Sequence, residues 1–407
     1  MNLEIMAPAG NFECLNAAIH GGANSVYFGV GNLNMRSHSA NNFSSADLQQ
    51  VCDICRENGV KSYLTLNIVL YDEDIEPMKE ALQAAKAAGI TAVIASDMAA
   101  ITYARELGIE VHISTQLSIS NSQSLKFYAQ YADVIVLARE LNVCQVLEFL
   151  ATIGRVQIKG PSGRILEIEM FCNVACCLAI SGKCYLSLHE YGASANRGSC
   201  YQLCRRGYSV TDLETGNTLE IDNKYIMSPK DLCTIEFMDK IIDAGVTVFK
   251  IEGRARSAEY VKTVARCYRD AADAVLAGKY TPEYASELKE RLSTVFNRGF
   301  WDGYYQGARL GEWSEVYGNK ATKSKKYIGK VTNYFSNIGV AEILIETGSI
   351  SVGDNVIIIG PSTGVVEVTV EEIRVDLKST ESAVKGEYCS IAVPEKLRRS
   401  DKLYLFQ

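Results

Sequence analysis

The sequence lacks several features that define whole classes of protein. No stretch reaches the run of about 18 apolar residues that a membrane-spanning helix needs, so we expect no membrane span. Proline is scarce, with 7 residues in 407, and 47% of the residues are hydrophobic, which excludes a mostly disordered chain. The first residues carry no basic segment of the kind that begins a signal peptide. We therefore expect a globular, cytoplasmic protein.

Positive charge is limited as well. The chain has 41 lysine and arginine residues against 48 aspartate and glutamate residues, which gives a net charge of −7 at pH 7. Contact with nucleic acid would therefore need a local basic patch. The basic residues that cluster in the sequence are Lys320, Lys323, Lys325, Lys326 and Lys330, and Arg197, Arg205 and Arg206. A solvated linker is the alternative explanation of the lysine run.

The signature motifs of several enzyme classes are missing. There is no His-Glu-x-x-His zinc motif and no Gly-x-Ser-x-Gly nucleophile elbow. A peptidase would therefore have to use a cysteine nucleophile with a histidine partner, for which His189 is the candidate. The glycine-rich dinucleotide fingerprint is absent after the first apolar run, where Pro8-Ala9-Gly10-Asn11 stands instead.

Short apolar runs alternate with amphipathic stretches that end in glycine over the first 160 residues, and two more runs follow at wider spacing. This pattern predicts strand–helix units around a parallel sheet. The eight predicted strands are Leu3–Ala7, Ser25–Val30, Ser62–Leu70, Ala92–Ala95, Val111–Thr115, Val134–Ala138, Leu166–Phe171 and Val246–Ile251. Eight units are the number in an α/β fold of the (β/α)8, TIM-like barrel type. A doubly wound sheet is the alternative.

The expected domains follow from this pattern. We assign residues 1–280 to the barrel, with a long helix over Ala258–Leu276 and a cysteine-rich insertion at 172–230 after the seventh strand. That insertion falls at the C-terminal face of the barrel, where the active sites of such folds lie. Residues 281–326 are predicted to form a helical connector, and residues 327–407 a small C-terminal β-barrel.

Cysteine is unusually abundant. The chain has 13 cysteines, and six of them fall between Cys172 and Cys204. Disulfides are rare in the cytoplasm, so this grouping indicates a metal or catalytic site. We expect Cys172 and Cys176 to pack in the core. Four converging thiolates can hold an iron–sulfur cluster or Zn²⁺, and the candidates are Cys177, Cys184, Cys200 and Cys204.

Polar residues that follow predicted strands are candidates for catalysis. Gln116 follows the fifth strand, Arg139 the sixth, and Glu252 and Arg254 the eighth. The two arginines are suited to hold a carboxylate or a phosphate. A structural salt bridge between Arg139 and Glu252 is the alternative. Arg36, in the loop after the second strand, is a further candidate for ligand contact.

The cysteine-rich stretch resembles the signature of the collagenase-like peptidase family U32. That signature contains Glu-x-Phe-x-His-Gly-Ala-x-Cys-x-x-x-Ser-Gly-x-Cys, followed by Asn-x-Gly-x-Cys-x-x-x-Cys-Arg. The matching residues are Glu169, Phe171, Ala175, Cys177, Ser181, Gly182, Cys184, Asn196, Gly198, Cys200, Cys204 and Arg205. Other segments similar to the family are Ala7-Pro8-Ala9-Gly10, Ser228-Pro229-Lys230-Asp231-Leu232, Lys250-Ile251-Glu252-Gly253-Arg254 and Asn297-Arg298-Gly299-Phe300.

The resemblance implies more than the peptidase name. The family includes a hydroxylase that makes 5-hydroxyuridine at the tRNA wobble position and requires prephenate, and an rRNA cytidine hydroxylase. Iron–sulfur clusters are associated with this group. The resemblance therefore implies an enzyme that hydroxylates tRNA or rRNA with a prephenate-like anionic co-substrate and a cluster, expected as [4Fe–4S], on Cys177, Cys184, Cys200 and Cys204. A collagenase-like peptidase and a Zn²⁺-stapled RNA-binding scaffold stay open as alternatives.

One pair of residues departs from the family pattern. Asn173-Val174 stand where the signature has His-Gly. An asparagine can exchange hydrogen bonds but cannot shuttle a proton near neutral pH. If that histidine is catalytic in the relatives, the reaction of this chain differs from theirs.

Overall fold

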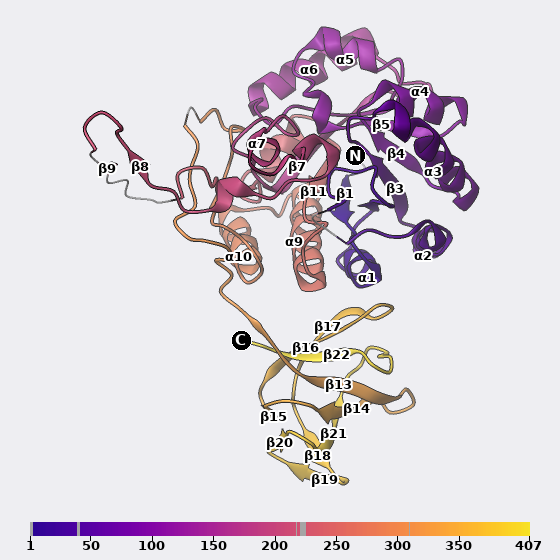
Figure 1. Ribbon diagram of the computed structural model, residues 1–407. Coiled ribbons are helices and arrows are strands. Elements are labelled where there is room, and N and C mark those ends of the chain that lie inside the picture. Colours follow the sequence, from indigo (N-terminus) through magenta and orange to yellow (C-terminus); the bar gives the residue numbers. More distant parts are fainter. Residues whose placement is uncertain (1–2, 39–40, 217, 220–224, 309) are drawn as a thin grey trace.

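The structure is a computed structural model with two bodies, an α/β body and an all-β body that lies beneath it in Figure 1. The residues that it describes are 3–38, 41–216, 218–219, 225–308 and 310–407. Residues 217 and 220–224 of the expected insertion, and residue 309 of the expected connector, lie outside the described residues.

Eight parallel strands form a closed barrel in the α/β body. They are β1 (Glu4–Pro8), β2 (Ser25–Phe28), β3 (Lys61–Leu66), β4 (Ala92–Ala95), β5 (Glu110–Ile113), β6 (Val134–Val136), β7 (Glu167–Ala175) and β11 (Val248–Ile251). The sheet runs from β11 through β1 to β7 in chain order, and β11 also pairs with β7. That last pairing closes the sheet, so the predicted (β/α)8 barrel is confirmed and the doubly wound sheet is wrong.

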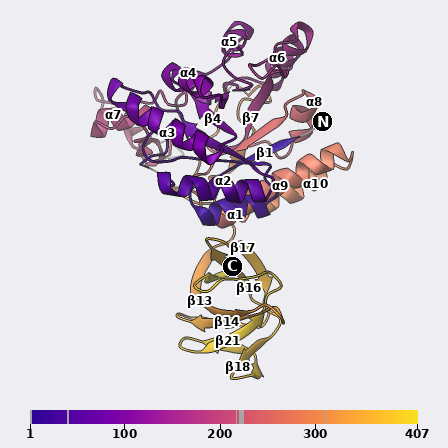
Figure 2. The same cartoon turned by 90° about the vertical axis from the view of Figure 1, so that its right-hand side faces the viewer.

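Helices cover the outside of the barrel (Figures 1 and 2). They are α1 (Phe12–His20), α2 (Leu48–Glu57), α3 (Ile75–Ala88), α4 (Met98–Glu106), α5 (Ser122–Tyr128), α6 (Val143–Val156), α8 (Met238–Asp243), α9 (Ala258–Leu276) and α10 (Pro282–Ser293). In α2 the buried residues are Leu48, Val51, Cys52 and Cys55, one helical face that packs on the sheet. No helix in the described ranges is long and apolar enough to cross a membrane.

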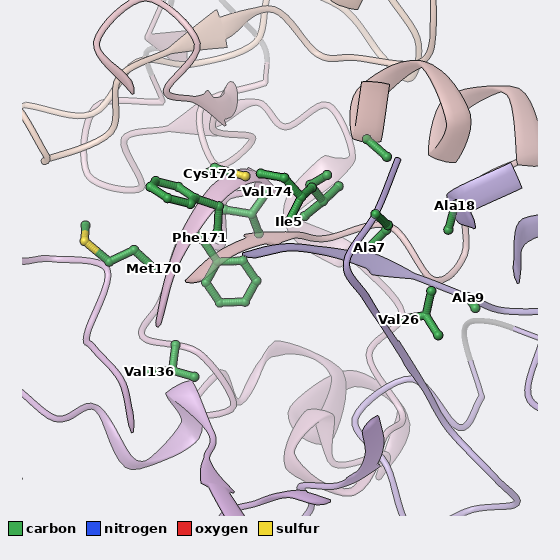
Figure 3. Packing of buried hydrophobic residues seen from close by; sticks show 14 of the residues in the cluster. Ile5, Ala7, Ala9, Ala18, Val26, Val136, Met170, Phe171, Cys172 and Val174 are labelled. Carbon is green, nitrogen blue, oxygen red and sulfur yellow. The ribbon is translucent and has the colours of Figure 1, made fainter. Parts of the chain in front are cut away.

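Successive residues of a strand face opposite sides, which gives the barrel two buried layers. Ile5 and Ala7 of β1 belong to the main cluster between strands and helices, whereas Met6 packs inside the barrel with Tyr27 and Tyr63. Figure 3 shows part of the main cluster, including Ile5, Ala7 and the labelled residues of β7.

The seventh strand is longer than the sequence predicted. We expected it over Leu166–Phe171, but β7 spans Glu167–Ala175. Its added residues pair in antiparallel fashion with β10 (Asp231–Cys233), which satisfies their backbone groups. Cys172 is therefore a buried strand residue and no part of the insertion. The neighbouring strand β12 (Phe300–Trp301) pairs with β10.

The remainder of the insertion contains little regular structure. Its elements are α7 (Leu186–Tyr191), the 3-10 turns Ala195–Arg197 and Leu203–Arg205, and the short strands β8 (Val210–Thr211) and β9 (Thr218–Leu219). Arg205 holds this segment against β7: its guanidinium donates to the carbonyl oxygens of Pro229 and Cys176, at 2.6 Å each. These contacts give Arg205 a structural role.

The C-terminal body is an antiparallel β region with its own apolar core. Its main sheet consists, in spatial order, of β17 (Gly364–Thr369), β16 (Asn355–Gly360), β22 (Lys402–Phe406), β13 (Lys325–Phe335), β14 (Val340–Ile345), β21 (Tyr388–Ala392), β18 (Ile373–Val375) and β19 (Lys378–Thr380). The strands β15 (Ser349–Ser351) and β20 (Ser382–Val384) form a separate pair. β17 contacts α1, where Asn16 Nδ2 donates to the Pro361 carbonyl at 2.7 Å (Figure 2).

The pairing of β7 with β11 carries a buried ion pair whose loss we expect to be costly. Lys250 Nζ lies 2.7 Å from Glu169 Oε1, inside the barrel. Lys250→Met leaves the Glu169 carboxylate buried without its partner, and we predict a loss of about 3–5 kcal/mol in the free energy of unfolding. Equilibrium urea unfolding measures it. The double variant Lys250→Met/Glu169→Gln removes both charges and should recover a large part of the loss; a double variant as unstable as the single one would contradict this account.

Candidate functional site

The carboxyl ends of the barrel strands surround a hollow that we call the mouth pocket. It is lined by seven of the eight residues that the sequence predicted for catalysis or for the cluster: Gln116, Arg139, Glu252, Arg254, Cys177, Cys184 and Cys200. The eighth, Cys204, lines an adjoining hollow that shares Cys177 and Cys200 with the mouth pocket. Residues that are far apart in the sequence thus meet at one end of the barrel.

Glu252 follows β11 and pairs with Arg36 rather than with Arg139. Glu252 Oε1 lies 3.1 Å from Arg36 Nη2 and 3.3 Å from Arg36 Nε. The backbone N–H of Glu252 donates to the Asn173 carbonyl at 2.7 Å, which fixes it against β7. Burial alone raises the pKa of Glu252, but the positive charges of Arg36 and Arg256 outweigh burial and hold the pKa below its ordinary value. Glu252 is therefore a carboxylate at neutral pH.

Arg254 is a buried cation, 5% exposed, in the loop that follows β11 and Glu252. Its Nη1 donates to Thr65 Oγ1 at 2.9 Å, and none of the ion pairs in the described ranges includes it. Burial lowers the pKa of Arg254 to about 10, so the guanidinium still carries its charge at neutral pH. Gly29 makes the necessary room, since a Cβ at this position would lie 2.6 Å from Arg254 Nη1.

Arg139 follows β6 and lies beside thiols. Its guanidinium is 5.8 Å from the centre of the Phe171 ring. Burial alone lowers the pKa of Arg139, but the charges of Cys177 and Cys176 and a hydrogen bond with Cys177 hold the pKa above its ordinary value. No ion pair with a carboxylate is found for Arg139 among the described residues. Arg139 is therefore a cation beside Cys176 and Cys177.

Gln116 lies in the turn that follows β5 and contacts the insertion. Its Nε2 and Ser181 Oγ are 3.2 Å apart, and its Oε1 is buried without a hydrogen-bond partner in the described part of the chain. Gly182 permits this approach, because its φ of +75° is left-handed and a Cβ would lie 2.3 Å from Gln116 Oε1. Gln116 and Gly182 both line the mouth pocket.

The four candidate cysteines are free thiols with partial access to solvent: Cys177 is exposed, and Cys184, Cys200 and Cys204 are half-buried. Burial raises the pKa of Cys204, the charge of Arg205 opposes this rise, and the negative charges of the other three thiolates add to it. The other three thiols therefore lie near enough to Cys204 to influence its pKa. By contrast Cys172 is fully buried, as expected, and Cys176 is half-buried.

These thiols fit a thiolate-bound inorganic group by their chemistry. Cysteine sulfur is the ligand that iron–sulfur clusters take and one of those that Zn²⁺ takes. Arg36 and Arg139 lie beside the thiols and offset thiolate charge. In the part of the chain that the structure describes, no three histidine, cysteine or acidic side chains are arranged to share a single metal ion. The fit therefore rests on the donor set and on the two adjoining hollows that the thiols line.

Two polar residues of the mouth pocket were not predicted as site residues. They are Asn67 and Lys250, of which Lys250 was noted only as part of a segment similar to the family. The sequence placed Asn67 within the predicted third strand, Ser62–Leu70. In the structure β3 ends at Leu66, and Asn67 begins the loop that follows. There its side-chain oxygen accepts the Met35 N–H at 3.2 Å. A shorter strand would have placed Asn67 among the residues that follow strand ends.

Other residues that the sequence analysis discussed, such as His189 and Asn173, lie outside the mouth pocket. His189 is exposed on α7 and lines neither hollow. Asn173, in the position of the family's histidine, is buried on β7, while Val174 faces the mouth pocket. Three of the five clustered lysines are in ion pairs, namely Lys320 with Glu315, Lys325 with Glu259 and Lys330 with Glu346. Because glutamates neutralise these three lysines, the lysine run is a poor candidate for a basic RNA-binding patch.

The fold and this site define a (β/α)8-barrel protein with a thiol-rich, arginine-lined mouth. Comparison with known families shows which family of such proteins the chain belongs to. Residues 10–315 match the profile of Peptidase family U32, and the chain belongs to that family.

Relatives with different names are similar in sequence to this chain. A protein named "Collagenase" from Porphyromonas gingivalis is 58% identical over 405 residues, which cover 100% of this chain and 98% of the relative. The "tRNA hydroxylation protein P1" of Bacillus subtilis is 32% identical, with 91% of this chain and 86% of the relative covered. The "23S rRNA 5-hydroxycytidine C2501 synthase" of Escherichia coli is 32% identical, with 86% and 52% covered.

The thiol environments predict an order of chemical reactivity. Burial raises the pKa of Cys14, Cys55, Cys267 and Cys389 to about 12, so at pH 8 only about one in 10⁴ of these thiols is ionised. In cluster-free native protein, iodoacetamide at pH 8 should label the exposed Cys177 and Cys144 first, Cys204 later, and the four buried thiols only after unfolding. Peptide mass spectrometry over time gives the order. Early labelling of the buried group would contradict the structure.

Proposed function

We propose that the protein is an iron–sulfur enzyme that hydroxylates RNA, with a wobble uridine of tRNA as the substrate base and 5-hydroxyuridine as the product. One observation carries the proposal. Four free thiols line two adjoining hollows at the mouth of a (β/α)8 barrel, beside two arginines that form no ion pair with a carboxylate among the described residues. The names of the two RNA-modifying relatives support the choice of RNA as substrate. An rRNA base is the related alternative.

The charges of the mouth pocket suit an anionic co-substrate. Of its cations, Lys250 is paired with Glu169 and Arg36 with Glu252. Arg139 and Arg254 form no ion pair with the described residues and are left for a ligand. Two guanidinium groups match a molecule with two carboxylates, such as prephenate. Gln116, with its unpartnered amide oxygen, offers an acceptor that orients a hydroxyl group of this ligand.

The thiol side of the pocket would hold the cluster. Cys177, Cys184, Cys200 and Cys204 would supply four thiolate ligands, expected to bind [4Fe–4S], and Zn²⁺ is the alternative. When bound, such a cluster supplies electron transfer or Lewis-acid chemistry beside the co-substrate. Arg36 and Arg139 offset the thiolate charge, and Glu252, a carboxylate at neutral pH, holds Arg36 in place.

A peptidase of the same family is the second candidate, and the 58% identity to a protein named collagenase favours it. Peptide hydrolysis by a cysteine nucleophile needs a base within hydrogen-bond reach of the thiol. The described residues that line the mouth pocket include four cationic side chains and the carboxylate Glu252, which is already paired with Arg36. The pocket thus provides groups for anion binding more readily than the groups of a thiol protease.

Metal content and RNA analysis test the proposal. We expect anaerobically purified protein to contain about four iron and four sulfide per chain, and expect cells without the protein to lose one hydroxylated nucleoside from their RNA. The quadruple variant Cys177→Ser/Cys184→Ser/Cys200→Ser/Cys204→Ser should lose both the metal and the nucleoside, whereas Cys144→Ser keeps them. Full RNA modification by the quadruple variant would overturn the proposal. Gelatin cleavage by metal-free protein, with unchanged RNA, would establish the peptidase instead.

The role of Arg254 in anion binding gives a separate prediction. Hydrogen bonds to a charged group contribute about 1.5–3 kcal/mol, so Arg254→Gln should raise the half-saturating concentration of prephenate by about ten- to a hundredfold. Arg254→Lys keeps the charge but loses the planar fork, and it should give an intermediate value. Thermal unfolding checks that both variants fold. An unchanged prephenate dependence in Arg254→Gln would remove Arg254 from the ligand site.

A further inference from the structure

A second hollow lies beside the mouth pocket and has a different character. It is lined by the aromatic side chains Trp301, Tyr304 and Trp313, together with Arg139, Glu140 and Cys177. The chain has two tryptophans, and both line this hollow, which we call the aromatic pocket. β12 brings Trp301 beside Leu232 of β10, and a bridge between Pro229 and Trp313 holds the other wall.

The aromatic rings form the walls of this pocket. Trp301 and Tyr304 pack edge to face, with ring centres 5.5 Å apart and planes at 74°. Tyr304 and Trp313 are 37% and 38% exposed, so they present ring surface to whatever enters. Trp301 is 7% exposed, and its indole N–H has no acceptor among the described residues. A buried donor without a partner is costly unless a ligand satisfies it.

The aromatic pocket and the mouth pocket share Arg139 and Cys177. A planar group in the aromatic pocket would therefore have Arg139 as a neighbour in common with an anion in the mouth pocket. It would also lie beside a thiol that we propose as a cluster ligand. The position is that of the second reactant in a reaction at the mouth.

We infer that the aromatic pocket is the subsite for the target base of the RNA, a pyrimidine turned out of its stack. The inference rests on the proposed function and deepens it by naming where the substrate base binds. Enzymes that modify bases hold them between aromatic side chains and contact their polar edges. The pocket offers ring faces for stacking, donors on Arg139 and Trp301 for the carbonyl oxygens of uracil, and an acceptor on Glu140 for its N3–H.

A peptide side chain fits this pocket less well. A proline or aliphatic side chain has no polar edge, so the Trp301 N–H would stay without a partner and the Arg139 guanidinium would lose water without compensation. A pyrimidine supplies acceptors and a donor in the plane of its ring. The polar groups at the wall therefore favour the base.

The two tryptophans make the test direct, because all indole fluorescence of the protein comes from this pocket. We would titrate the anaerobically purified protein with uridine 5′-monophosphate and, separately, with ribose 5-phosphate, which is the same molecule without the base. We expect saturable quenching by the first and none by the second. Quenching by both alike would mean phosphate binding elsewhere, and absence of quenching by either would mean an empty subsite; both results overturn the inference.

Gly311 offers a variant that fills the pocket without touching the mouth. Its backbone is not left-handed, and a Cβ there would lie 3.7 Å from both Trp301 Cη2 and Trp313 Cζ2, which is ordinary contact. Gly311→Leu extends a side chain between the two indoles, and the loss of one base–aromatic stack should weaken the nucleotide about tenfold or more. Tyr317→Leu, an exposed position in the same connector outside the pocket, should bind like the wild type.

The outcomes separate this inference from the proposed function. Nucleotide quenching that Gly311→Leu abolishes supports the subsite even if no RNA hydroxylation is found. RNA hydroxylation that Gly311→Leu leaves unchanged, with equal nucleotide affinity, overturns the subsite while the function stands. Quenching by a Gly-Pro-Ala peptide in place of the nucleotide would assign the pocket to a peptide substrate and overturn the inference.

Discussion

The ion pair between Lys250 and Glu169 lies where the barrel closes, and the geometry of the mouth depends on it. Both side chains are almost fully buried, and the Lys250 ammonium also lies 4.8 Å from the centre of the Tyr27 ring and 5.6 Å from that of Phe171. Two charges removed from water are tolerated only while they stay together. The pair therefore fixes the register of β7 against β11 at one position.

Directly beyond this pair the register shifts. Lys250 pairs with Phe171 but Ile251 pairs with Asn173, so Cys172 is an extra residue in β7. Such a bulge turns the strand and re-aims the residues that follow. β7 continues to Ala175 along β10 and delivers Cys177 to the mouth, while Glu252 is held by the Asn173 carbonyl. β7 reaches the mouth because it continues beyond its pairing with β11 along β10.

The mouth combines two kinds of chemistry. Its lining includes cations suited to carboxylates or phosphates and thiols suited to iron or zinc. Arg139 links the two, since it lies beside Cys177 and lines the mouth pocket as well as the aromatic pocket. The relatives carry both collagenase and RNA-modification names, and the barrel alone does not decide between these activities, since fold does not fix function.

Local pattern determined much of this protein by itself. Apolar runs and amphipathic stretches predict the eight barrel strands and the bounds of α9, and residues after strand ends include Gln116, Arg139, Glu252 and Arg254, because strand ends of a parallel barrel share one face. Only tertiary structure decided the rest. The partner of Glu252 is Arg36, the third strand stops before Asn67, and two tryptophans far from the barrel strands in sequence face Arg139. These facts depend on pairings such as β7 with β10 and β10 with β12, and contacts between segments so distant along the chain leave no periodicity in the sequence.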